Sequence, residues 1–202
     1  MNFLQALHRA AADIAETLTP AIVEVRSGAG SGAGTIWHED GLILTNAHVL
    51  RAGPPQVRLH DGRALPARVL AEDATRDLAA LAVDARGLPT VDLGESGPAT
   101  LRPGQWVMAL GHPFGVRSSA TTGVVISAGS DWPGLPAGGG AWLVVSLPLR
   151  PGHSGGPVLD SQSKVIGINT MITGPKTGVA VPVNVAKLFL KKALTRSAAA
   201  AG

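Results

Sequence analysis

A segment of seven residues, Pro151-Gly152-His153-Ser154-Gly155-Gly156-Pro157, constrains the fold more than any other part of this chain. Three glycines and two flanking prolines exclude a helix interior and a central strand, so the segment must form a tight turn. Such a turn can aim neighbouring backbone N–H groups in one direction. Ser154 is therefore a candidate nucleophile, and the amides of Gly152 and Ser154 are candidate donors to a developing oxyanion. A plain surface loop is the alternative interpretation of these seven residues.

The rest of the chain has the composition of a protein built from many short strands. Hydrophobic residues make up 45% of its 202 residues, which is enough for a sizeable core, and charged residues only 15%. The 26 glycines and 15 prolines indicate frequent tight turns rather than a helical bundle. The length suits one domain or two small subdomains that share a core.

Hydrophobic periodicity predicts a helix at each end of the chain. Apolar residues recur at spacings of three and four over residues 2–18, and this amphipathic helix either docks on its own domain or forms a subunit contact. Asn184 is expected to cap a final helix from Val185 to about Arg196. A loop-rich stretch over residues 84–104 indicates a boundary between two subdomains. The predicted strands are 21–26, 35–37, 42–45, 57–60, 65–71, 78–83, 106–110, 120–127, 142–147, 157–160, 165–171 and 178–181.

A nucleophilic serine needs a base, and the base needs an orienting acid. His48 follows directly after the predicted strand 42–45, where the backbone could fix it toward a cleft. Asp77 stands just before another apolar strand, where its carboxylate could accept a hydrogen bond from an imidazole. A structural or merely exposed histidine is the alternative for His48, and Asp73 is the nearest competitor of Asp77.

Two glycine-rich segments resemble nucleotide-binding loops but lack the required context. Residues 28–34 fit a loose dinucleotide fingerprint after a strand, yet a strand, a turn and another strand follow instead of a helix. We therefore expect a flexible glycine loop that leads into a β-hairpin. Residues 174–178 lack two of the glycines that a phosphate loop would require, so a hairpin turn is expected there.

Charge and composition limit the classes of partner that this chain is expected to bind. The net charge is +3, but most of the basic residues are scattered and aromatic residues make up only 3%, so no nucleic acid is expected as a partner. The absence of cysteine excludes disulfides, thiol catalysis and cysteine-based metal sites. No apolar run reaches membrane-spanning length, and residues 1–18 do not read as a signal peptide. The sequence leaves two cellular locations to consider: the protein is cytoplasmic, or it is exported and its signal peptide has been removed.

The order His48, Asp77, Ser154 is that of the chymotrypsin-like enzymes. Thr45-Asn-Ala-His48-Val resembles the T-N-x-H-V motif of the HtrA/Deg branch, Asp77-Leu-Ala-Ala-Leu its D-L-A-x-L motif, and Gly152-His-Ser154-Gly-Gly-Pro its G-N-S-G-G-P motif. The resemblance covers roughly residues 20–190 in the right order. Further segments match other motifs of this branch: Gly30-Ser-Gly32-Ala-Gly34, Leu110-Gly-His-Pro-Phe-Gly115, Gly167-Ile-Asn-Thr170 and Ala180-Val-Pro182.

This resemblance implies an all-β fold of two perpendicular six-stranded antiparallel barrels with the triad between them. It divides the chain into an N-terminal helix (1–19), a first barrel (20–100), a second barrel (101–183) and a C-terminal helix and tail (184–202). HtrA proteins usually carry a PDZ domain after the protease domain, and none fits in this chain, so we expect a protease domain without one. Family members commonly form trimers through N-terminal segments, so the helix over residues 2–18 could supply the subunit contacts of a homotrimer.

The resemblance also implies a serine endopeptidase for unfolded or misfolded proteins, a role in protein quality control, with no metal or organic cofactor. His48, Asp77 and Ser154 would form the triad, and Gly152 and Ser154 the oxyanion hole. The primary pocket of the family usually takes small or medium aliphatic side chains. No acidic residue lies in the segments that would form it here, so a preference for lysine or arginine is not expected. The expected residues of this substrate pocket are Leu149, Arg150, Ile168, Asn169, Thr170 and Val181.

Three residues depart from the motifs: His153, His112 and Arg150 each stand where asparagine is usual. Two alternatives to a constitutive protease follow. One is a catalytically silent homologue that binds exposed hydrophobic segments. The other is a conditionally activated protease whose oxyanion loop orders only when a peptide or partner binds.

Overall fold

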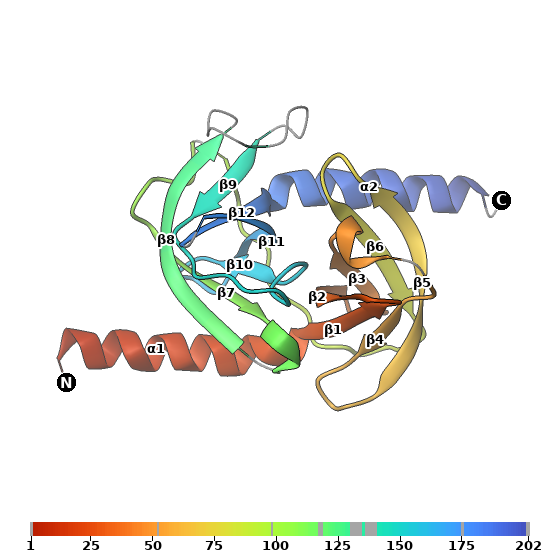
Figure 1. Cartoon of the computed structure of the whole chain (residues 1–202), viewed down its shortest axis with the longest axis horizontal. Helices are drawn as coiled ribbons and strands as arrows, with labels where there is room; N and C mark the ends of the chain where they lie inside the picture. Colours follow the sequence, from red (N-terminus) through yellow and green to blue (C-terminus); the bar gives the residue numbers. More distant parts are fainter. Residues whose placement is uncertain are drawn as a thin grey trace.

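Two closed antiparallel barrels of six strands each follow one another along the chain (Figure 1). The computed structural model describes residues 2–51, 53–97, 99–116, 119–129, 135, 141–174 and 176–200. Over these residues the fold agrees with the all-β prediction, and the two six-stranded barrels implied by the sequence motifs are confirmed. The glycine- and proline-rich sequence of residues 129–140 predicts a flexible loop, and most of this stretch lies outside the described residues.

Both barrels have the same strand order. In each, the first strand pairs with the second and the fourth, which closes the sheet on itself. The first barrel consists of β1 (Ile22–Ser27), β2 (Gly30–His38), β3 (Leu42–Thr45), β4 (Gln56–Arg58), β5 (Ala64–Asp73) and β6 (Leu78–Val83). The second consists of β7 (Trp106–Gly111), β8 (Ser119–Gly129), β9 (Trp142–Val145), β10 (Pro157–Leu159), β11 (Val165–Gly174) and β12 (Thr177–Pro182).

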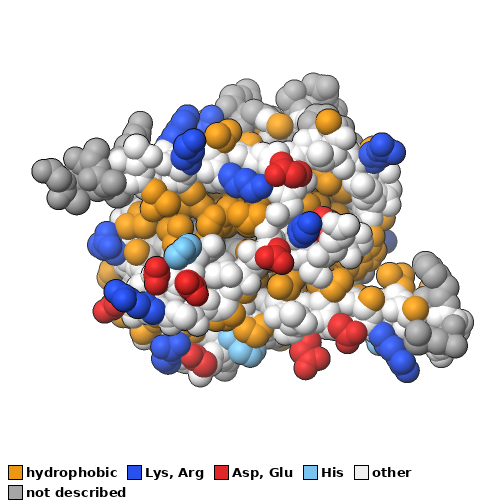
Figure 2. Space-filling view, turned by 180° about the vertical axis from the view of Figure 1, so that it is seen from behind, with side chains coloured by type: hydrophobic (Ala, Val, Ile, Leu, Met, Phe, Trp, Pro, Cys, Tyr) orange, Lys and Arg blue, Asp and Glu red, His pale blue; other side chains and the backbone are white. Residues whose placement is uncertain are grey.

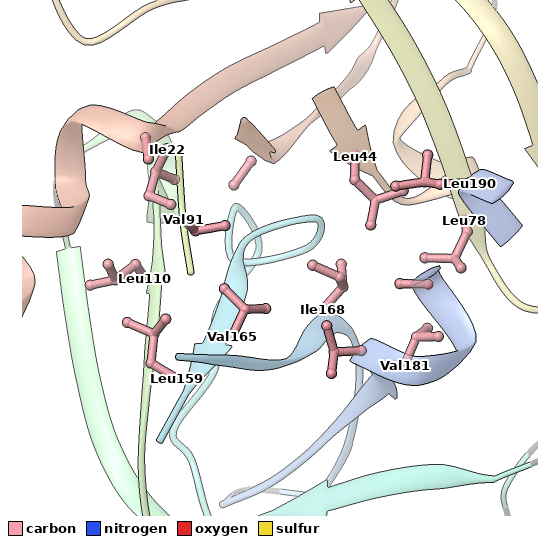
Figure 3. Close-up of a cluster of buried hydrophobic side chains, with 14 of the residues drawn as sticks. Ile22, Leu44, Leu78, Val91, Leu110, Leu159, Val165, Ile168, Val181 and Leu190 are labelled. Carbon is pink, nitrogen blue, oxygen red and sulfur yellow. The ribbon is translucent and has the colours of Figure 1, made fainter. Parts of the chain in front are cut away.

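Alternating side chains on these strands build two kinds of core. Successive residues of a strand face opposite sides of its sheet. Ile43 therefore packs inside the first barrel, whereas its neighbour Leu44 packs in a cluster that also takes residues from the second barrel. Figure 3 shows this second kind of core, in which Leu44 and Leu78 lie near Ile168 and Val181. The shared cluster holds the two barrels against each other.

The glycine-rich stretch expected to be a flexible loop is mostly strand. Only residues 28 and 29 form the turn, and β2 begins at Gly30. A Cβ at Gly34 would press against side chains of Val23, Val25 and Ile43, so glycine is required there by the crowded barrel interior. The glycines of β2 reflect close packing, which their composition alone could not distinguish from flexibility.

A helix at each end completes the fold. The N-terminal helix α1 (Phe3–Leu18) begins at a capping box between Asn2 and Gln5 and runs below the second barrel (Figure 1). The C-terminal helix α2 (Val183–Ala200) begins two residues earlier than expected, because Asn184 lies in its first turn and donates to the Ser96 carbonyl at 2.9 Å. It contacts β11 and β12 of the second barrel and β5 and β6 of the first, so it bridges the two barrels.

Candidate active site

His48 stands at the end of the first barrel that faces the second. Strand β3 ends at Thr45, and the short 3₁₀ helix η2 (Ala47–Val49) carries His48. The imidazole Nδ1 lies 2.7 Å from Asp77 Oδ2, and the backbone N–H of His48 donates to Asp77 Oδ1 at 2.9 Å. Two bonds to one carboxylate fix both the position and the tautomer of the ring, because an ionised carboxylate only accepts.

Asp77 occupies an uncommon backbone conformation just before β6. Its φ is +53°, a left-handed value that aspartate tolerates better than most residues. The Asn46 side-chain amide donates to the Asp77 carbonyl at 2.8 Å and holds this conformation. Burial acts to raise the pKa of the Asp77 carboxyl, but hydrogen bonds from the His48 ring, the Thr170 hydroxyl and the His48 backbone outweigh it, so this pKa lies below its ordinary value. The competitor Asp73 is instead paired with Arg76 at 2.7 Å.

Thr170 joins the two barrels at this point, a role that sequence reasoning missed. Its hydroxyl donates a short hydrogen bond to Asp77 Oδ2, across from β11 of the second barrel. Its backbone carbonyl accepts a hydrogen bond from Ser154 Oγ at 3.2 Å. The sequence indicated Thr170 only as a pocket residue, since nothing in the motif tells which way the hydroxyl points.

The loop that carries Ser154 is anchored to both barrels. The Ser154 carbonyl accepts from the Ala33 amide of β2 at 2.7 Å, and the Gly155 amide donates to the Asn169 carbonyl of β11 at 2.9 Å. Gly155 has φ +86°, and a Cβ there would collide with the Ala33 carbonyl. Only glycine therefore allows this loop to lie against β2.

The amides of Gly152 and Ser154 are available to a ligand. Residues 150–153 form a turn in which the His153 amide donates to the Arg150 carbonyl at 3.0 Å and Gly152 has φ +105°, as a type II turn requires. The Phe114 amide donates a hydrogen bond to the Pro151 carbonyl at 3.2 Å. The Gly152 N–H belongs to the same planar peptide, so it points in the opposite direction from this carbonyl. Within the described residues, neither the Gly152 nor the Ser154 amide donates to a protein acceptor.

His48 and Ser154 line the same cleft between the barrels, a hollow of about 420 Å³. Within the described residues, no hydrogen bond joins the two side chains, because Ser154 Oγ is directed to Thr170. Of the six expected pocket residues, Leu149, Arg150, Asn169 and Thr170 also line this cleft. The remaining lining residues are Ala29, Gly30, Ser31, Arg51, Pro151, Gly152, His153, Met171 and Ile172.

Ile168 and Val181, the other two expected pocket residues, do not line the cleft. They pair across the ladder of β11 and β12, and both are buried in the core between the barrels (Figure 3). Successive residues of a strand face opposite sides, so Ile168 and Val181 face the core between the barrels, whereas their neighbours Asn169 and Ala180 face the other side of the sheet. The ladder of β11 and β12 shifts register after Asn169, at the residues of β11 that line the cleft. Asn169 also braces the Ser154 loop, since its amide donates to the Gly156 and Pro157 carbonyls at 3.2 Å.

His153, next to Ser154, is buried and turned away from a catalytic role. Its Nδ1 lies 3.1 Å from both the amide nitrogen and the carbonyl oxygen of Arg150. Burial lowers the pKa of His153, although its hydrogen bond to Arg150 acts in the other direction. Among the described residues, no cluster of three or more histidines and acids could hold a metal ion. None of the helices in the described part of the chain has the length and hydrophobicity needed to cross a membrane.

The family described as the trypsin-like peptidase domain matches residues 32–168. The chain belongs to this family. The peptidase domain is 39% identical over 173 residues to the mitochondrial serine protease HTRA2 of Drosophila pseudoobscura pseudoobscura, and 36% identical over 172 residues to the putative serine protease HhoB of Synechocystis. Each alignment covers 83% of this chain, which spans only 40% and 41% of these relatives.

Solved structures of HtrA-type proteases resemble the whole peptidase domain. The protease AlgW with a decapeptide superposes with a TM-score of 0.82 at 26% identity, covering 92% of this chain and 67% of that one. The same protease with a tripeptide gives 0.81 at 30% identity, covering 90% and 62%. These similarities confirm the HtrA type that the sequence motifs predicted.

Proposed function

We propose that this peptidase domain is a serine endopeptidase that cleaves unfolded or misfolded proteins through His48, Asp77 and Ser154. The observation that carries the proposal is one cleft that combines a serine, a histidine bonded to a carboxylate at 2.7 Å, and two amides without protein acceptors. These are the nucleophile, the oriented base and the oxyanion donors that acyl transfer requires. The cleft lies between two barrels, so an extended chain can enter it from the side.

The first chemical step transfers the Ser154 proton to His48. Ser154 Oγ leaves its bond to the Thr170 carbonyl and turns toward Nε2 of His48, which accepts the proton as Oγ attacks the scissile carbonyl carbon. Asp77 holds the ring and stabilises its cationic form. The tetrahedral intermediate then collapses, the C–N bond breaks, and His48 donates the proton to the leaving amine. Water, deprotonated by the same imidazole, hydrolyses the acyl-enzyme.

The Gly152 and Ser154 amides stabilise the negative oxygen of each tetrahedral intermediate. Because Phe114 holds the Pro151 carbonyl away from the cleft, the Gly152 N–H is oriented before a substrate arrives. An oxyanion donor of this kind contributes roughly 10²–10³ in turnover. The conditionally activated alternative keeps one observation in its favour, namely the resting bond from Ser154 Oγ to Thr170 rather than to His48.

The substrate pocket suits small or medium aliphatic side chains. Leu149, Met171 and Ile172 supply apolar lining, and no acidic residue lines the cleft within the described residues. A strong preference for lysine or arginine would require an acidic residue at the base of the pocket. The cleft can bind only an extended segment of a substrate. Folded proteins rarely expose such segments, so we expect unfolded proteins to be the substrates.

We also propose that α1 serves assembly, with a homotrimer as the first state to test. Leu4 is 71% exposed and Leu7 40% exposed, although Ile14 on the same helix packs against the protein core. Figure 2 shows hydrophobic atoms on this helix where it projects at the lower right. A second copy of the chain could bury these side chains.

The experiment is casein cleavage by the purified chain and by Ser154→Ala. The substitution removes only Oγ, so we expect an unchanged melting temperature and complete loss of cleavage. Ser161→Ala is the matched control, because Ser161 is an exposed serine outside the cleft, and it should retain full activity. Cleavage by Ser154→Ala at the wild-type rate would refute the assignment.

A further inference from the structure

Two arginines line the cleft without an acidic partner. Arg51 lies just beyond His48 on the first barrel, and Arg150 precedes the Ser154 loop on the second; both are exposed. Within the described residues, no carboxylate lies within 4.0 Å of either guanidinium group. Other arginines behave differently, since Arg63 and Arg76 each pair with an aspartate at 2.7 Å.

The neighbouring hollow adds no free negative charge. It holds about 410 Å³, and Gly30 and Gly152 line both it and the cleft. Its only acid among the described residues is Glu24, whose buried carboxylate is shared by Arg26 at 2.7 Å and Arg58 at 3.4 Å. Of these two arginines only Arg26 lines the hollow, so its described lining holds one guanidinium group and one carboxylate that is already paired, and no free negative charge.

Asp77 does not reverse this balance. Its carboxylate does not line the cleft and lies behind His48, where it already accepts hydrogen bonds from the His48 ring and Thr170. During attack the imidazolium neutralises it. A peptide in the cleft therefore meets the unpaired charges of Arg51 and Arg150 without a competing anion on the lining.

We propose that Arg51 and Arg150 are specificity-determining residues that select substrates with aspartate or glutamate close to the scissile bond. This inference rests on the proposed peptidase function and adds a charge preference to it. The aliphatic pocket accepts the residue at the cleaved bond, and the two guanidinium groups bind carboxylates flanking it from opposite barrels. Guanidinium suits this role because its planar donors match a carboxylate.

The expected preference is moderate, because both arginines are exposed. Exposed ion pairs contribute about 0.2–1 kcal/mol, which corresponds to as much as fivefold in kcat/KM for each arginine. A carboxylate flanking the bond on each side should therefore raise kcat/KM by about two- to thirtyfold over the amide analogue. The preference should weaken with added salt, because salt screens exposed charges.

The experiment compares two fluorogenic peptides that share an aliphatic cleavage site and differ only in flanking glutamates or glutamines. The ratio of their kcat/KM values is measured for the wild-type chain, Arg51→Gln, Arg150→Gln and the double variant, at low and high salt. Arg68→Gln is the matched control, because Arg68 is exposed on β5 and does not line the cleft. The ratio cancels any effect of a substitution on the chemistry itself.

We expect the wild-type and Arg68→Gln ratios to agree, each single cleft variant to lower the ratio, and the double variant to bring it close to one. A wild-type ratio of one, or a ratio that survives the double substitution, would overturn the inference while leaving the peptidase function intact. If neither peptide is cleaved, the peptidase proposal fails instead. Fluorescence anisotropy with the same two peptides then tests the charge preference by itself, and equal binding would overturn it.

Discussion

Replacing Thr170 with valine tests the hydrogen bond that connects the two barrels at the site. Valine has nearly the same shape as threonine, so the substitution removes the hydroxyl without leaving a cavity. The Thr170 carbonyl that accepts from Ser154 stays in place. The lost bond is to an ionised carboxylate in a partly buried place, and such bonds contribute about 1.5–3 kcal/mol. We therefore expect Thr170→Val to lower the free energy of unfolding by this amount at pH 7.

Urea unfolding at several pH values measures this effect. The folded-state pKa of Asp77 is lowered, so the stability that its carboxylate contributes is present above its unfolded pKa, near 3.8, and is lost as the pH falls through the folded pKa. The difference between wild type and variant should accordingly narrow below about pH 4. Thr100→Val is the control, because it removes an exposed hydroxyl bonded to the Gly97 carbonyl and should change stability by less than about 0.5 kcal/mol. A Thr170→Val effect as small as that of the control would refute the reasoning.

Three further predictions concern the aspartate, the glycine beside the serine and the buried histidine. Asp77→Asn should lower kcat by about 10⁴ through loss of the correct tautomer, whereas Asp73→Asn should retain most activity in the same casein assay. Gly155→Ala should lower the melting temperature far more than Gly104→Ala, because both glycines have positive φ but only the former would collide with backbone; equal shifts would contradict this. Burial lowers the folded-state pKa of His153, so its stabilising contribution is present above its unfolded pKa, near 6.5, and declines as the pH falls toward the folded value. His153→Asn should therefore lose less stability than wild type between pH 7 and pH 5, and parallel melting profiles would count against this cause.

Residue types and their order predicted the principal parts of the site. His48, Asp77 and Ser154 each stand at a strand end or turn, and the sequence pattern alone indicated that they belong together. The structure brings His48 and Asp77 within 2.7 Å of each other, and His48 and Ser154 to one cleft. Apolar segments likewise predicted strands at nearly all the places where strands occur.

Features that depend on side-chain direction could not be predicted in this way. The hydroxyl of Thr170 bonds to Asp77 across the boundary between barrels, and no local pattern indicates a contact between residues so far apart in sequence. Ile168 and Val181 were expected in the pocket, but strand alternation turns them into the shared core. The glycines of β2 looked flexible because composition does not show how tightly neighbouring strands pack.

The most direct test of the account is labelling of the purified chain with a fluorophosphonate, located by mass spectrometry, with and without an unfolded protein substrate. The reaction needs a nucleophilic serine, an oriented base and oxyanion donors at one place. Because the Gly152 amide is already oriented toward the cleft, we expect a single label on Ser154 even without substrate. Labelling only with substrate would instead support conditional activation. The absence of label under both conditions would contradict the account and favour a protein that binds peptides without cleaving them.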